Sequence, residues 1–218
     1  MRADFTIAQN GKARCVIVRQ ADATAPEIKA AEELAHTLEQ ITGAKFEIQD
    51  AGAKISERAI IIGQGKVASE YFADAPFNKL GADEIVMQMK GNKLLLAGRR
   101  PPGTLYAVCR FLQEQCGVRW WTPWATTIPK NSTLKISDLD IRYAPPFENR
   151  APFWFPAFNA EWSYRNGSTD QNGRLTAEQG GSIKYAESMG HSFYQLVLKI
   201  DAMFRIDTDQ VRRGQRII

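Results

Sequence analysis

Five of the carboxylates that follow the double proline at positions 145 and 146 are candidates for chemistry, because acids of this kind can cleave glycosidic bonds. In most glycoside hydrolases two carboxyl groups flank the scissile bond, one acting as the acid and the other as base or nucleophile. The order of residues does not show which two of the five would meet in space, and most surface acids have no catalytic role. The candidates are Glu148, Glu161, Asp170, Glu178 and Glu187.

His191 also has a side chain that could take part in a reaction. It stands in the stretch GHSFYQL, just before two aromatic residues. Its imidazole could bind a substrate hydroxyl or transfer a proton, and a structural loop histidine is the alternative. The only other histidine, His36, lies in a predicted helix and is expected at the surface. Because the two histidines are far apart and no cysteines are paired with them, we expect no metal site and no cofactor.

Three of the five tryptophans lie within the stretch VRWWTPW, at positions 120, 121 and 124. Their rings could stack on a pyranose, or they could anchor protein packing. On a strand, Trp120 and Trp121 point to opposite faces. One ring would then enter the core while the other faces outwards. We expect packing and domain contact rather than direct ligand stacking, with Trp121 as the candidate for a sugar contact.

A glycine turn, Gly63-Gln64-Gly65, follows a predicted strand and could present backbone N–H groups to a phosphate. The dinucleotide fingerprint needs a third glycine where Ala68 stands, although alanine is sometimes allowed there, and no convincing acid-bearing strand follows at the right distance. Lys66 is not followed by the serine or threonine of a phosphate-binding loop. We expect an ordinary tight turn, with a nucleotide or phosphosugar site as the weaker alternative.

The elements that would position these residues begin with a strand over 13–20. Thr24 and Glu27 form a capping box that opens a helix, Pro26 lies in its first turn, and Gly43 ends it. The runs KFEIQ (45–49) and RAIIIG (58–63) predict two more strands, the second covered on both faces.

The second half of this region predicts a hairpin of 84–90 and 93–98 around Gly91-Asn92. A helix follows, with Leu105 and Leu112 on its apolar face, and it ends at Gly117. After it we expect a strand that begins at Val118 and an extended segment over 133–143. This order predicts an α/β (α+β) fold with a mixed β-sheet and two main helices. The double proline then marks a domain boundary, because proline can continue neither a helix nor a central strand.

Composition excludes several classes of protein. The chain has 218 residues, a formal net charge of +4 and 44% hydrophobic residues, as in ordinary globular proteins. No basic stripe is interleaved with aromatic residues, so nucleic acid is not an expected partner. Three cysteines make no disulfide framework and are expected as buried free thiols. No apolar run approaches the roughly 20 residues of a membrane span, so we expect no membrane partner.

The stretch GRRPPGTLYAVCRFLQEQCGVRWWTPWATTIPK, followed by DLDIRYAPPFENRAPFW, resembles the N-terminal region of bacterial glycoside-hydrolase-like proteins that carry the domain of unknown function 4838. It is similar to the accessory α/β domain of family 20 hexosaminidases and to the N-terminal domain of family 67 α-glucuronidases. The earlier AAEELAHTLEQITG fits the first helix of such a domain. The resemblance covers about residues 10–198 and is most specific over 98–154.

The resemblance implies an accessory α/β domain over 1–144 and, over 145–218, the incomplete start of a (β/α)8 barrel. Residues 148–155 would form the first barrel strand. In family 20 an arginine near the start of that strand holds hydroxyls of the sugar, and Arg150 matches it in position. An ion pair at the domain boundary is the alternative for Arg150. His191 and Tyr194 resemble a family segment without an assigned role.

The sequence departs from the family in one respect that bears on activity. A barrel takes about 250 residues, only about 70 follow the boundary, and no Asp-Glu pair matches the family 20 acids. We therefore expect the non-catalytic accessory domain, with the start of the barrel, of a glycoside hydrolase that acts on carbohydrate. A stand-alone carbohydrate-binding or scaffold module is the alternative. The compartment would be periplasmic or secreted if a leader peptide precedes these residues and cytoplasmic otherwise, and the oligomeric state is open.

Overall fold

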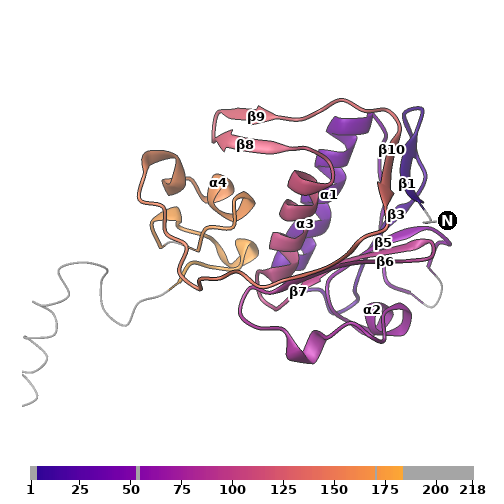
Figure 1. The fold of residues 1–218 in the computed structure, drawn as a ribbon, viewed down its shortest axis with the longest axis horizontal. Coiled ribbons are helices and arrows are strands. Elements are labelled where there is room, and N and C mark those ends of the chain that lie inside the picture. Colours follow the sequence, from indigo (N-terminus) through magenta and orange to yellow (C-terminus); the bar gives the residue numbers. More distant parts are fainter. Residues whose placement is uncertain (1–3, 53–54, 170, 184–218) are drawn as a thin grey trace, which may run out of the picture. The chain divides into compact units, whose positions relative to one another are not determined.

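A mixed six-stranded sheet forms the centre of the fold. The computed structural model describes residues 4–52, 55–169 and 171–183. The strands of the main sheet lie in the order β11-β6-β7-β5-β3-β4 (Figure 1). Four adjacent strands are parallel, and β6 and β11 run antiparallel to their neighbours. The six strands are β3 (Val16–Arg19), β4 (Ile48–Asp50), β5 (Ala59–Ile62), β6 (Ile85–Lys90), β7 (Lys93–Gly98) and β11 (Asp140–Tyr143).

Two long helices cover one face of this sheet, and a short helix lies on the other (Figure 1). The long ones are α1 (Ala25–Thr42) and α3 (Gly103–Glu114), and the short one is α2 (Lys66–Tyr71). Helix α1 begins and ends where its capping residues predict, with Gly43 in the left-handed conformation at a φ of 75°. The predicted mixed α/β arrangement with few helices is confirmed.

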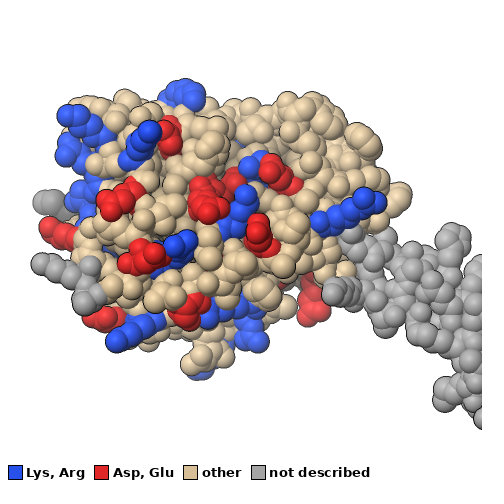
Figure 2. Space-filling view, turned by 180° about the vertical axis from the view of Figure 1, so that it is seen from behind, with Lys and Arg blue, Asp and Glu red and all other residues tan. Residues whose placement is uncertain are grey.

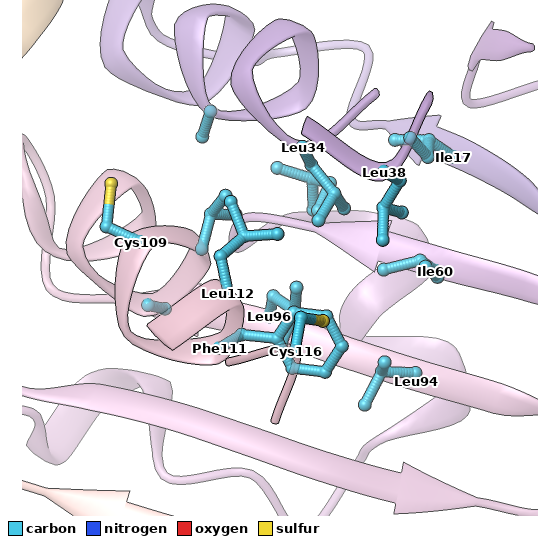
Figure 3. Packing of buried hydrophobic residues seen from close by; sticks show 14 of the residues in the cluster. Ile17, Leu34, Leu38, Ile60, Leu94, Leu96, Cys109, Phe111, Leu112 and Cys116 are labelled. Atoms are coloured by element: carbon cyan, nitrogen blue, oxygen red, sulfur yellow. The ribbon is translucent and has the colours of Figure 1, made fainter. Parts of the chain in front are cut away.

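All four residues of β5 are apolar because both faces of this strand are buried. Ile60 and Ile62 pack on the side of α1 and α3, whereas Ala59 and Ile61 pack on the side of α2. Figure 3 shows Ile60 next to Leu38 of α1, and both belong to the same buried cluster as Leu34 of α1 and Leu112 of α3. Since successive strand residues point to opposite faces and both faces are covered, each position is apolar.

We predicted one extended segment over 133–143, but in the structure these residues form two strands that belong to different sheets. β10 (Leu134–Ser137) pairs with β1 (Asp4–Gln9), which pairs in turn with β2 (Lys12–Ala13). β11 pairs with β6 in the main sheet. The chain changes sheet around Leu139, whose side chain is buried and whose carbonyl accepts a hydrogen bond from the Met89 N–H.

Two further differences concern strands at the margins of the fold. The strand predicted at 45–49 begins three residues later as β4, after Phe46 has packed its ring into the core. The strand at Val118 forms β8 (Arg119–Thr122), and its hairpin partner is β9 (Ala125–Thr127).

The residues after β11 form short turns instead of a strand. Helix α4 (Ala160–Arg165) and three 3-10 turns, at Phe155–Phe158, Gln171–Gly173 and Ala177–Gln179, are the regular elements of this segment. Residues 148–155, predicted as the first barrel strand, form no strand. Tyr164 and Leu175 of this segment lie buried in the same core as α1 and α3. The boundary at residue 144 stays a prediction. No described helix is long and apolar enough to cross a membrane.

Two glycines allow the end of β7 to contact the start of α3. A Cβ atom at Gly98 would lie 2.4 Å from the carbonyl carbon of Gly103. We predict that Gly98→Ala lowers the free energy of unfolding by about 3 kcal/mol, because backbone must move to admit the methyl group. Urea denaturation measures the change. Gly52→Ala is the control, because its Cβ would meet no atom within 4 Å. Equal effects of the two substitutions would contradict the prediction.

Candidate functional site

The carboxyl ends of the parallel strands are the usual place for a ligand in a fold of this class. Ligands of open α/β sheets bind where the order of strands reverses. Here the reversal lies at β3, which has β4 on one side and β5 on the other. The glycine turn 63–65 follows β5 at this edge, so its geometry decides whether the crevice is free.

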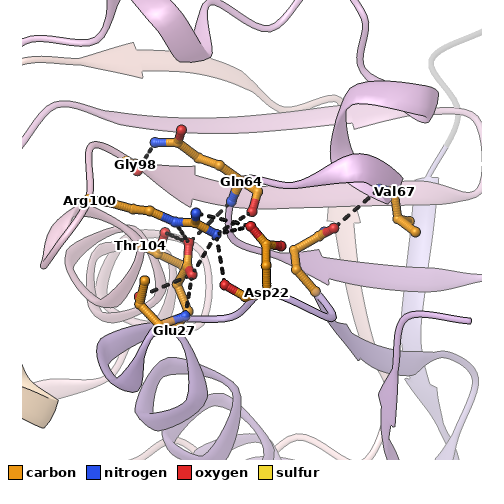
Figure 4. Close-up of polar contacts among 9 residues, drawn as sticks. Asp22, Glu27, Gln64, Val67, Gly98, Arg100 and Thr104 are labelled. Atoms are coloured by element: carbon orange, nitrogen blue, oxygen red, sulfur yellow. Dashed lines mark hydrogen bonds and ion pairs between the residues drawn. The ribbon is translucent and has the colours of Figure 1, made fainter.

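The carboxylate of Glu27 lies against this glycine turn (Figure 4). Glu27 is fully buried, in the first turn of α1. Its oxygens accept hydrogen bonds from the Thr24 N–H at 2.8 Å and the Thr104 hydroxyl at 3.4 Å. They also accept from the Gln64 N–H at 3.3 Å. The glycine turn therefore directs a backbone N–H at an anion, and that anion belongs to the protein.

Both glycines of the turn are approached closely by side chains of the protein. A Cβ atom at Gly63, whose φ is +83°, would lie 2.6 Å from Glu27 Oε1. One at Gly65 would lie 2.5 Å from Gln20 Oε1, which accepts a hydrogen bond from the Val67 N–H. These contacts account for the two glycines without a phosphate and favour the interpretation of a tight turn.

Arg100, in the loop between β7 and α3, supplies the opposite charge. Its Nε lies 3.1 Å from Glu27 Oε1 and a terminal nitrogen 3.0 Å from Oε2. It also donates to Asp22 at 3.1 Å and to the Gln64 carbonyl at 2.8 Å. Partial burial lowers the pKa of the guanidinium, but hydrogen bonds to Glu27 and Asp22 outweigh it and the pKa is raised. The sequence marked Glu27 only as a helix cap and gave no sign of Arg100.

A cavity of about 140 Å³ lies between α3, the adjacent strands and the segment after β11. Arg150 lines this cavity, and its wall also contains Asp83, Tyr106, Arg110 and Arg165. An arginine-rich cavity could accept the hydroxyls or the carboxylate of a sugar. The partners of each arginine therefore decide what the cavity offers.

Arg150 directs its guanidinium at acceptors of the protein itself. It pairs with Asp83 at 2.8 Å and donates to the carbonyls of Gly167 at 2.6 Å and Phe147 at 2.8 Å. All three of its nitrogens thus have protein acceptors. Its predicted contact with sugar hydroxyls would require one of these bonds to open, and it stays a prediction.

The guanidinium of Arg165 on α4 also binds acceptors of the protein itself. It binds the buried carboxylate of Glu33 on α1 through two nitrogens, at 2.9 and 3.2 Å, and Tyr164 donates its hydroxyl to the same carboxylate at 3.0 Å. Burial opposes the charge of Arg165, yet the pair with Glu33 raises its pKa. The network anchors α4 to α1, and the sequence gave no indication of it.

Trp120 and Trp121 take the opposite faces that a strand predicts. The Trp120 ring is buried in the core, whereas Trp121 is 58% exposed and donates its indole N–H to the Thr127 hydroxyl at 3.0 Å. The backbone carbonyl of Trp121 accepts from the indole of Trp162 at 3.1 Å. The predicted sugar contact of Trp121 is not tested by these distances and stays a prediction.

Of the remaining candidate site residues, three lie within the described ranges and three lie outside them. Glu148, Glu161 and Glu178 are exposed, and Glu161 pairs with Arg165 at 3.3 Å. His191, Asp170 and Glu187 lie outside the described residues. Within the described ranges no group of three or more histidine, cysteine or acidic residues could hold a metal ion.

The three cysteines are free, buried thiols, as the sequence predicts. Burial raises the pKa of Cys15 to about 12 and that of Cys116 to about 12, and it raises the pKa of Cys109 well above its ordinary value. Since only the thiolate is a strong nucleophile, none of them is suited to nucleophilic catalysis.

Thiol labelling tests this arrangement. We predict that the folded chain at pH 8 reacts with less than one equivalent of Ellman's reagent within minutes, because the raised pKa values keep the thiols protonated and burial excludes the reagent. Denaturation in guanidinium should release all three. Rapid labelling of the native chain would show that at least one thiol is accessible.

Removing Arg100 tests the Glu27 network. We predict that Arg100→Met lowers the free energy of unfolding by about 3 kcal/mol, because it leaves the buried carboxylate of Glu27 without its counter-charge. Lys90→Met is the matched control, since the pair of Lys90 with Asp74 is exposed on both sides, and it should change stability by less than about 0.5 kcal/mol. Comparable losses in the two variants would show that Arg100 is not the required partner.

The fold is similar to part of a much longer enzyme. A family GH115 4-O-methyl-α-glucuronidase with specificity for decorated arabinogalactans matches 66% of this chain at 20% identity, with a TM-score of 0.54. The chitobiase of Flavobacterium johnsoniae matches 76% of this chain at 16% identity, with a TM-score of 0.41. The matches span 19% and 23% of those chains. No protein-family model and no curated protein matches the sequence. Over about two thirds of its length, this chain therefore shares the fold of a segment that makes up about a fifth of the glucuronidase.

Proposed function

We propose that this chain is a non-catalytic α/β domain, with the elements that follow it, of an enzyme that acts on carbohydrate. The observation that carries the proposal is the fold shared with a segment of the GH115 glucuronidase, which covers two thirds of this chain. The resemblance of residues 98–154 to domains that precede a glycoside hydrolase barrel supports the same assignment. In this proposal the bond-cleaving residues belong to another part of the enzyme.

The chemistry of the described residues supports a structural role for the domain. At the glycine turn after β5, the backbone N–H groups and the buried acid Glu27 are paired within the protein, Glu27 with Arg100. The acid in the arginine-lined cavity, Asp83, is ion-paired with Arg150. A glycosidase needs one carboxyl that is protonated and another that is free to attack or to activate water, and among the cavity residues no such pair is present.

The first barrel strand over residues 148–155 belongs to the same proposal. These residues form no strand here. A strand of a parallel barrel needs a neighbour on each side to satisfy its backbone groups. We therefore propose that this segment pairs only when the strands on either side of it are present in the complete enzyme.

An activity assay tests the proposal. We expect the purified chain to release no nitrophenol above the buffer rate from a panel of nitrophenyl glycosides that includes α-glucuronides and N-acetylhexosaminides. An intact glucuronidase in parallel wells serves as the positive control. Turnover that purifies with the chain and is abolished by Glu148→Gln or Glu161→Gln would overturn the assignment.

A further inference from the structure

Seven exposed aromatic side chains define what we call the aromatic surface of this protein. They come from the β8–β9 hairpin and from the segment that follows the double proline, and their exposed fractions lie between 39% and 76%. The residues are Trp121, Trp124, Phe147, Phe153, Trp154, Phe155 and Phe158. Only Tyr71, on α2, is a further large hydrophobic residue exposed among the described residues.

Contacts between rings connect the two segments. The ring centroid of Trp124 in the hairpin lies 6.3 Å from that of Phe155, and the ring centroids of Phe153 and Phe158 are 5.4 Å apart. Trp154 lies 5.5 Å from Trp162, whose indole binds the backbone of Trp121. At roughly 200 Å² for a whole aromatic side chain, the exposed parts amount to about 850 Å². The largest apolar patch of a typical monomer covers about 300–600 Å², whereas a stable interface buries about 800 Å² on each partner.

The ring geometry favours a protein as the occupant over a polysaccharide. A row of sugar rings needs aromatic faces that lie parallel, but the three ring pairs are inclined by 42°, 66° and 81°. Four of the seven residues are phenylalanines, which offer no hydrogen bond to a hydroxyl. Clusters of exposed, tilted rings resemble the aromatic anchors at the centre of a protein interface.

The charge of the surface favours a second copy of the same chain. The stretch 147–158 has two charged residues, the exposed Glu148 and Arg150, which is paired with Asp83. A two-fold dimer places a surface against itself, so a like-charged patch would repel its copy. This surface has almost no charge to repel, and it offers no charge pattern that would select a different partner.

We propose that the aromatic surface is the interface of a homodimer. The dimer and the barrel strand proposed for residues 148–155 would use the same side chains, Phe153, Trp154 and Phe155, so the dimer is proposed for the chain of 218 residues by itself. The dimer can fail without affecting the proposed function, which the activity assay tests separately. Pairing the two copies would remove about 850 Å² of aromatic surface on each from water, which matches an interface of standard size.

Sedimentation velocity of the full chain tests the dimer. At roughly 10 µM, in the range expected for such an interface, we expect a discrete species with twice the mass of the chain. The emission of the exposed indoles should shift to shorter wavelength as concentration rises through the transition. The double variant Phe153→Ser, Phe155→Ser should sediment as a monomer. The control Tyr71→Ser removes an exposed aromatic residue outside the aromatic surface and should remain a dimer.

Several outcomes would overturn the proposal. A wild-type chain that stays monomeric at about 100 µM excludes the dimer, and a saturable change of indole emission with arabinogalactan would then assign the surface to a glycan. Aggregates of increasing size would show a surface without a specific partner. A double variant that melts like the wild type and still dimerises would place the interface elsewhere. If that variant does not fold, the concentration dependence of the wild-type indole emission alone decides the question.

Discussion

A buried carboxylate that must keep its counter-charge organises the α/β part of this protein. Glu27 has no solvent contact, and an ionised acid in that position is tolerated only with ion pairs and hydrogen bonds around it. Its partners come from four places in the chain: the residue before α1, the turn after β5, the loop after β7 and the first turn of α3. Helix positions, glycine positions and the Arg100 loop therefore depend on one another.

The same network explains why the glycine turn after β5 contacts protein side chains and not a ligand phosphate. The glycines at 63 and 65 have the close backbone approach that a phosphate would need, but their space is used by the side chains of Glu27 and Gln20. A protein anion occupies the place of a ligand anion. The glycine turn and its network therefore contribute to stability.

The segment after the double proline is attached by the same type of interaction. Arg150 binds Asp83, which precedes β6, and Arg165 binds Glu33 on α1. These buried or half-buried pairs fix the turns and α4 against the helices, while the aromatic side chains of the same segment remain exposed. The polar side chains of the segment, together with buried Tyr164 and Leu175, thus attach it to the core, and its exposed aromatic side chains are available for an external partner.

The sequence by itself determined the local elements of this protein. The Thr24–Glu27 pair and Gly43 fixed the ends of α1, the Gly91-Asn92 loop fixed the β6–β7 hairpin, and the alternation of Trp120 and Trp121 separated a buried ring from an exposed one. Each of these depends on residues within a few positions, so caps, turn geometry and side-chain periodicity are sufficient. The resemblance to glycoside hydrolase domains also came from a continuous stretch.

Only the tertiary structure decided the pairings between distant residues. Arg100 meets Glu27 across 73 positions, and Arg165 meets Glu33 across 132. Nothing in the spacing of charges indicates which acid a given arginine will reach, because ion pairs have no sequence periodicity. The division of residues 133–143 between two sheets has the same cause, since strand partners that are far away in the chain decide where each half pairs.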